Sequence, residues 1–144
     1  MLRMKVLTQL NGRQREEVRD LENLCREQDK IQGGISLTAD EDTGTFPTYF
    51  LCYEEDLLAG FVILYRMPDM TAEICSYIHP QYRRRTMYKK LMTAVFREMK
   101  QAGIETGYYV FEPRESKNLK EMTEQGYFSY SHSEYLMEWK YSYQ

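Results

Sequence analysis

A cluster of arginine and lysine side chains stands out in a chain that is acidic overall. Residues 83–90, the basic segment, read Arg-Arg-Arg-Thr-Met-Tyr-Lys-Lys, whereas the whole chain has 19 basic and 22 acidic residues and a net charge of −3. The segment opens a predicted helix, and backbone amides at a helix N-terminus favour negative charge. A solvated basic face is the alternative explanation of any charge run. The position of this run predicts a local anion site.

The elements that must position this segment follow from periodicity and turn residues. Apolar residues recur at helical spacing over 13–30 and 86–101. Runs of aliphatic, aromatic and β-branched residues predict strands over 48–53, 57–65, 71–78 and 105–111, and a strand pair within 127–141. We expect a loop over 38–47 and a short helix over 116–124. This order predicts the α/β class: a single domain spanning 1–144, with a mixed sheet and helices on both faces.

The basic segment and the strand before it resemble the GNAT superfamily, the N-acetyltransferases that use acetyl-coenzyme A. In that family a Val/Ile-x-Pro stretch precedes Arg/Gln-x-x-Gly-x-Gly/Ala at the opening of the central helix. Here Ile78-His79-Pro80 precedes Arg83, with Thr86 and Tyr88 at the places of the small residues. The resemblance implies a GNAT-like acyl-CoA N-acyltransferase fold with acetyl-CoA as co-substrate. It also implies the cofactor-binding residues Tyr77, Ile78, Arg83, Arg84, Arg85, Thr86, Met87, Tyr88 and Asn118.

The resemblance further implies a catalytic glutamate on the strand that leads to the basic segment. Glu73, in Thr-Ala-Glu-Ile, holds that place. Acetyl transfer to an amine needs a base for the ammonium proton and donors for the oxyanion, and the donors would be backbone amides near Tyr77 and Ile78. An ordinary solvent-facing carboxylate is the competing interpretation of Glu73, because glutamate is seldom buried.

Departures from the family pattern keep a second hypothesis open. Glycines at the places of Thr86 and Tyr88 let the backbone of relatives close on the pyrophosphate. Many relatives also place a proton-donating tyrosine four residues before a Gly-Phe pair, where this chain has Met122 before Gly126-Tyr127. The leading hypothesis is an N-acetyltransferase acting on a primary amine of a small molecule or peptide. The alternative is a catalytically impaired GNAT-fold protein that binds acyl-CoA or a protein partner.

Composition limits the other classes of function. The net charge of −3 provides no general basic field for nucleic acid or a membrane surface. Without a signal-like start or a run long enough to span a bilayer, we expect a cytoplasmic protein. Cys25, Cys52 and Cys75 lack metal or disulfide spacing and are expected in the core. His79 and His132 have no partner at ligand spacing, which predicts no metal site.

The sequence gives less information about the amine that would accept the acetyl group. In the GNAT superfamily, specificity resides in the first helix, the loop after it and the final hairpin, which here correspond to 13–47 and 127–141. Acidic residues there, including Glu22 and Asp40, favour a cationic amine. The aromatic-rich C-terminal segment would suit a homodimer.

Overall fold

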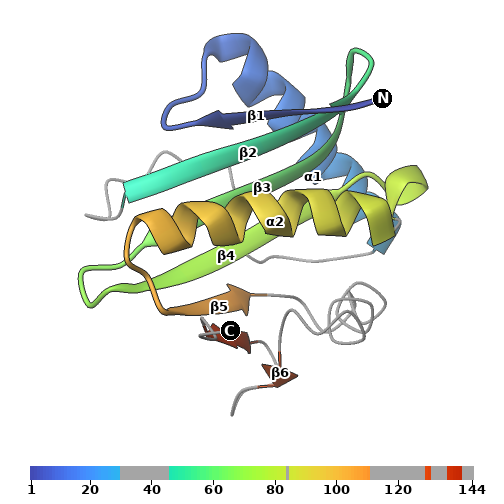
Figure 1. Ribbon diagram of the computed structural model, residues 1–144. Coiled ribbons are helices and arrows are strands. Elements are labelled where there is room, and N and C mark those ends of the chain that lie inside the picture. Colours follow the sequence, from blue (N-terminus) through green and yellow to red (C-terminus); the bar gives the residue numbers. More distant parts are fainter. Residues whose placement is uncertain (30–45, 84, 111–128, 131–135, 141–144) are drawn as a thin grey trace.

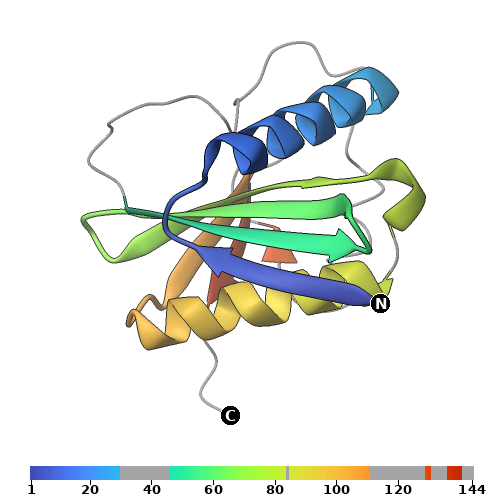
Figure 2. The ribbon, with the colours of Figure 1, turned by 90° about the horizontal axis from the view of Figure 1, so that it is seen from above.

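A mixed β-sheet with a long helix on each face forms the described part of the chain (Figures 1 and 2). The structure, a computed structural model, describes residues 1–29, 46–83, 85–110, 129–130 and 136–140. Its elements are β1 (Leu2–Leu7), α1 (Gly12–Asp29), β2 (Phe46–Glu54), β3 (Leu57–Arg66), β4 (Thr71–Ile78), the 3-10 turn η1 (Pro80–Tyr82), α2 (Arg85–Gln101), β5 (Thr106–Val110), β6 (Ser129–Tyr130) and β7 (Leu136–Lys140).

The strands follow the order β1-β2-β3-β4-β5-β7-β6 across the sheet. Among the described strands, β4 and β5 form the parallel pair, and the other neighbours are antiparallel. A parallel pair requires a crossover connection, and α2 provides it here. The predicted mixed sheet with helices on both faces is confirmed.

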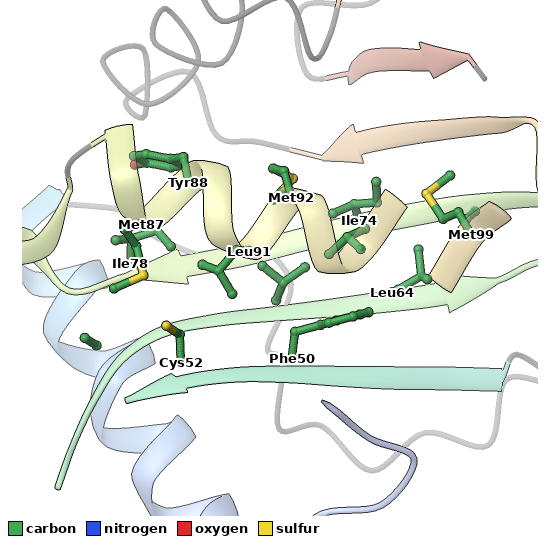
Figure 3. Packing of buried hydrophobic residues seen from close by; sticks show 14 of the residues in the cluster. Phe50, Cys52, Leu64, Ile74, Ile78, Met87, Tyr88, Leu91, Met92 and Met99 are labelled. Carbon is green, nitrogen blue, oxygen red and sulfur yellow. The ribbon is translucent and has the colours of Figure 1, made fainter. Parts of the chain in front are cut away.

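Each face of the sheet carries its own hydrophobic core. Successive side chains of a strand point to opposite faces, so alternate residues of the central strands contribute to different cores. The core under α2 includes Phe50, Val62, Leu64, Ile74, Ile78, Met87, Tyr88 and Leu91 (Figure 3). The core under α1 includes Val18, Leu21, Cys25, Leu51, Phe61, Ile63, Cys75 and Tyr77. All three cysteines are buried and free, as expected of core residues.

A glycine in β3 lets α2 approach the sheet closely. A Cβ atom added at Gly60 would lie 2.9 Å from Leu91 Cδ1 and 2.9 Å from Met87 Sδ. Both helix side chains are buried, with 0% and 2% of their surface exposed, so they have little room to move aside. Because Met87 lies in the first turns of α2, this contact also determines where the helix begins relative to the end of β4.

The first helix begins at a reciprocal side-chain cap. Gln14 N donates to Asn11 Oδ1 over 2.8 Å, and Asn11 N donates to Gln14 Oε1 over 2.9 Å. Such a capping box satisfies amides that the first turn leaves without helical partners. The predicted helix over 13–30 is therefore confirmed over the described residues, with its start at Gly12.

Most of the predicted strands and the central helix lie where the sequence places them. The predicted strand 71–78 matches β4, and the predicted helix 86–101 matches α2 within one residue. The helix ends as expected at Gly103, which adopts the left-handed φ of 74°. The predicted helix over 116–124 lies outside the described residues, and β6 and β7 form the antiparallel pair expected within 127–141.

Two predictions near the N-terminal half need correction. No strand was expected before the first helix, but β1 pairs with β2 along the edge of the sheet. The predicted loop over 38–47 also extends too far, because β2 already begins at Phe46. Pro47 is tolerated in the strand because β1 pairing reaches only Tyr49, so no neighbour on that side requires an amide from Pro47.

Filling the space at Gly60 should weaken the fold. We expect Gly60→Ala to lower the free energy of unfolding by about 1–3 kcal/mol, because buried side chains of α2 must move to accept the methyl group. Gly12→Ala is the matched control, because nothing lies within 4 Å of its added Cβ. Urea denaturation measures both variants. Equal stability of Gly60→Ala and the parent protein would contradict the close packing of α2.

Candidate functional site

In the described part of the chain, the central strand β4 continues beyond the last residue that pairs with β5. That pairing runs from Thr71 opposite Thr106 to Ile74 opposite Tyr109. On its other side, β4 stays paired with β3 as far as Ile78 opposite Gly60. Residues 75–78, the β4 extension, therefore have β3 on one side. On the other side they lie beyond the last β5 partner among the described residues, which run there to Val110.

The ladder with β3 determines which amides of the β4 extension face this second side. His79 N donates to Ala59 O over 2.8 Å, so the amide of His79 points towards β3. Amides alternate in direction along an antiparallel strand. The amide of Tyr77 therefore also points towards β3, and those of Ser76 and Ile78 point towards the side where β5 pairing has ended.

The end of β4 is held by side chains from two other segments. The carbonyl oxygen of Ile78 accepts a hydrogen bond from Cys25 Sγ of α1 at 3.2 Å. It also accepts one from Arg83 Nε at 3.0 Å, just after η1. The guanidinium group of Arg83, the first residue of the basic segment, is thereby anchored beside the β4 extension.

The short turn η1 is capped by a neutral histidine. His79 Nδ1 accepts a hydrogen bond from Gln81 N at 3.1 Å, and the imidazole lies edge-on to Tyr82 with ring centroids 5.3 Å apart. Burial and, secondarily, the positive charge of Arg83 lower the pKa of His79 below its usual 6.5. The unprotonated acceptor that the cap needs is therefore favoured at neutral pH.

The residues expected to meet the cofactor along α2 divide into different environments. Thr86 is exposed in the first turn, whereas Met87 and Tyr88 are buried with 2% and 0% of their surface exposed (Figure 3). Their side chains fill the core under α2, so any contact with a ligand beyond the helix start would come from their backbone atoms. Arg84 and Asn118 lie outside the described residues, and Arg85 is the first residue of α2.

The candidate base lies on the opposite face of the sheet from α2. Glu73 alternates with buried Ile74 of the α2 core and shares its face with Cys75 and Tyr77. It is half-buried and stands in register with Tyr65 of β3 and Tyr108 of β5. With a rise of about 3.3 Å per residue, it lies about 10 Å along the strand from Ser76.

One acidic residue expected to attract a cationic acceptor already has a partner. Glu22 of α1 is only 5% exposed, and its Oε1 lies 3.7 Å from Arg26 Nε. The guanidinium of Arg26 lies 5.9 Å from the ring centre of Tyr77. This arrangement ties α1 to β4 and balances the Glu22 charge. Asp40 lies outside the described residues.

The described ranges hold neither a cluster of metal-ligating side chains nor a helix that could span a membrane. No three His, Cys, Asp or Glu side chains there come together in a group that could hold a metal ion. No helix in this part of the chain is long and apolar enough to cross a membrane.

Comparison with known families agrees with this geometry. Residues 15–136 match the family model described as acetyltransferase (GNAT) family. The chain belongs to the GNAT acetyltransferase family. The match spans the basic segment, β4 and both helices, apart from the first residues of α1. No curated protein matches the sequence.

Solved structures share the GNAT fold over nearly the whole chain. A GNAT acetyltransferase from Staphylococcus aureus has a TM-score of 0.76 and 12% identity, covering 96% of this chain and 99% of that chain. An acetyltransferase from Streptococcus agalactiae has a TM-score of 0.74 and 15% identity, covering 96% and 98%. The PaiA N-acetyltransferase from Thermoplasma acidophilum, solved in complex with coenzyme A, has a TM-score of 0.68 and 18% identity, covering 96% and 99%.

The sequence did not indicate the direction of the Ser76 amide or the contact of Cys25 with the end of β4. Ser76 comes into view only through the hydrogen-bond alternation of β4, which depends on the register with β3. Cys25 reaches Ile78 from a helix far away in the sequence. The alternation of residues over 71–78 was the sequence signal available for the direction of the Ser76 amide. The contact of Cys25 with Ile78 depends on how α1 packs on the sheet, which no local pattern shows.

Proposed function

We propose that this GNAT protein is an acetyl-CoA-dependent N-acetyltransferase that acts on a primary amine. The β4 extension is the observation that carries the proposal: backbone amides face the side where β5 pairing ends, next to Arg83 and the start of α2. A pantetheine arm carries amide groups that can pair with such a strand edge, and a pyrophosphate suits a cationic turn before a helix.

The residues around the β4 extension fit acetyl-CoA. Arg83 and the other cations of the basic segment would hold the phosphates, together with backbone amides at the start of α2. Bound acetyl-CoA supplies a thioester-activated acetyl group. The amides of Ser76 and Ile78 would donate to the carbonyl oxygen, where negative charge develops during transfer. The coenzyme A in the PaiA structure from Thermoplasma acidophilum supports this choice of donor.

Glu73 would remove the proton from the acceptor ammonium. Its distance of about 10 Å along the strand from Ser76 favours transfer through ordered water rather than direct contact. Because Glu73 shares its face with Tyr77, the amine would approach from the α1 side of the sheet. The flanking tyrosines 65 and 108 suit a cationic acceptor.

A second candidate function rests on Tyr88. Relatives keep a small residue at this place, whereas here the tyrosine is fully buried beneath the first turns of α2. Should this packing alter the path of the phosphates, the protein would bind acyl-CoA or a protein partner without efficient transfer. The binding and turnover measurements below separate the two functions.

Removing charge from the basic segment should weaken cofactor binding. We expect Arg83→Ala with Arg85→Ala to raise the calorimetric Kd for acetyl-CoA at least about tenfold, because charge-assisted hydrogen bonds to phosphate are lost. The control pair Arg19→Ala with Arg97→Ala removes the same charge from exposed helix positions. Arg83→Lys keeps the positive charge but removes the Nε donor to Ile78 O, so its Kd shows how much of the affinity depends on each. Unchanged affinity in the double variant would refute the assigned phosphate site.

Replacing the candidate base should slow the reaction without affecting the cofactor. We expect Glu73→Gln to reduce kcat about 100-fold with the best primary amine from an acceptor screen, while the Kd for acetyl-CoA stays the same. The difference in kcat between the variant and the parent protein should become smaller as pH rises, because more of the acceptor amine is then already unprotonated. Glu55→Gln, in the exposed turn before β3, is the control. A pH–rate profile identical to the parent's would remove Glu73 from the mechanism.

A further inference from the structure

A second cationic site lies at the other end of α1, far from the β4 extension. A cavity of about 280 Å³ opens between β1, the first turns of α1 and the turn that joins β2 to β3. Its lining includes Arg3 and Lys5 of β1 and Arg13 of α1. At 1.5 Å per residue, Arg13 lies about 18 Å along the helix from Cys25, which contacts β4. The cavity is therefore separate from the acetyl-CoA site.

Tyr53 lines this cavity, and two of the cations lie over its ring. Arg3 stands opposite Tyr53 in the β1–β2 ladder, and its Cζ lies 5.4 Å from the ring centre. Lys5 Nζ lies 5.5 Å from the same ring centre. Because Tyr53 is only 4% exposed, its ring is a fixed aromatic surface rather than a mobile side chain. The two cations converge on one ring.

The acidic groups of the lining, Glu17 and Asp56, offset only part of the charge of the three cations, so the lining stays positive. Tyr53 Oη donates to Glu17 Oε1 over 2.9 Å, which holds that carboxylate beside the tyrosine. Burial and the contact with Glu17 raise the pKa of Tyr53, so the phenol keeps the proton that it donates. Asp56 is exposed in the turn after β2. Within the described ranges, Arg3, Lys5 and Arg13 form no ion pair.

Simpler explanations cover only part of this arrangement. Charged residues on an edge strand such as β1 discourage pairing with other chains, which accounts for Arg3 and Lys5. Protection of the strand edge does not explain Arg13 of α1, which lines the same cavity. The α1 N-terminus alone does not explain the site either, since Asn11 and Gln14 already cap it.

We propose that this cavity binds a compact organic dianion, either a phosphate monoester or a dicarboxylate. Arginine side chains hold both groups through paired N–H donors. The volume suits a small metabolite and is below that of most drug-sized ligand sites. The proposal concerns a site separate from acetyl transfer and stands whether or not the chain acetylates an amine.

NMR titration of the full chain tests the proposal with inorganic phosphate and succinate as probes, at constant ionic strength maintained with chloride. We expect saturable amide shifts centred on residues 3, 13 and 53 with at least one probe. Arg3→Gln with Arg13→Gln should raise its Kd at least fivefold. The matched pair Arg19→Gln with Arg97→Gln changes the net charge equally and should alter the Kd less than twofold.

The pattern of shifts determines the outcome. Preference for inorganic phosphate favours a ligand with a phosphate group, and preference for succinate favours a dicarboxylate. Shifts confined to residues 83–88 would place the binding at the basic segment and overturn the proposal. So would the absence of saturable shifts, or equal Kd values for the two double variants. Well-dispersed spectra of both variants verify that they fold.

Discussion

Within the described residues, the early end of the β4–β5 pairing is the constraint on which the rest of the site depends. The parallel partners stop at Ile74 and Tyr109, while β4 continues to Ile78 alongside β3. The ladder with β3 uses the backbone donors on one side of β4. Here the central strand of a packed sheet directs amides to its other side without leaving the hydrophobic cores that hold it.

The elements around this strand end keep its position fixed. The α2 helix packs closely on β3 at Gly60, which places the helix start beside the β4 extension. From the opposite face, α1 reaches the same point through the hydrogen bond from Cys25 to Ile78 O. Arg83 binds that same carbonyl oxygen. Both helices and the basic segment therefore meet where β4 ends, and this convergence positions cationic and amide donors together.

Local sequence patterns predicted the central part of the fold well. Continuous apolar runs and a terminating proline located β3 and β4, and four-residue spacing located α2. The edge strand β1 was missed although Leu2 and Met4 alternate with Arg3 and Lys5, because a single short alternation is a weak signal. Pairing with β2, a long-range contact, stabilises it.

The candidate site was only partly predictable from the sequence, because it too depends on long-range contacts. Charge clustering and the GNAT resemblance indicated Arg83, and the structure anchors it beside β4. Hydrogen-bond direction depends on strand register, so the distinction between the amides of Tyr77 and Ile78 could not be made from the sequence. The cavity over Tyr53 brings together residues from β1, α1 and β2 that no local pattern connects.

The most direct test of the account is to record amide NMR spectra of the assigned protein with acetyl-CoA and, separately, with ATP as a control polyanion. If the β4 extension pairs with the pantetheine arm, the amides of Ser76 and Ile78 shift with acetyl-CoA and remain in place with ATP, which has phosphates but no such arm. Binding of acetyl-CoA that leaves both amides unshifted, or identical shifts with ATP, would contradict the role assigned to the end of β4.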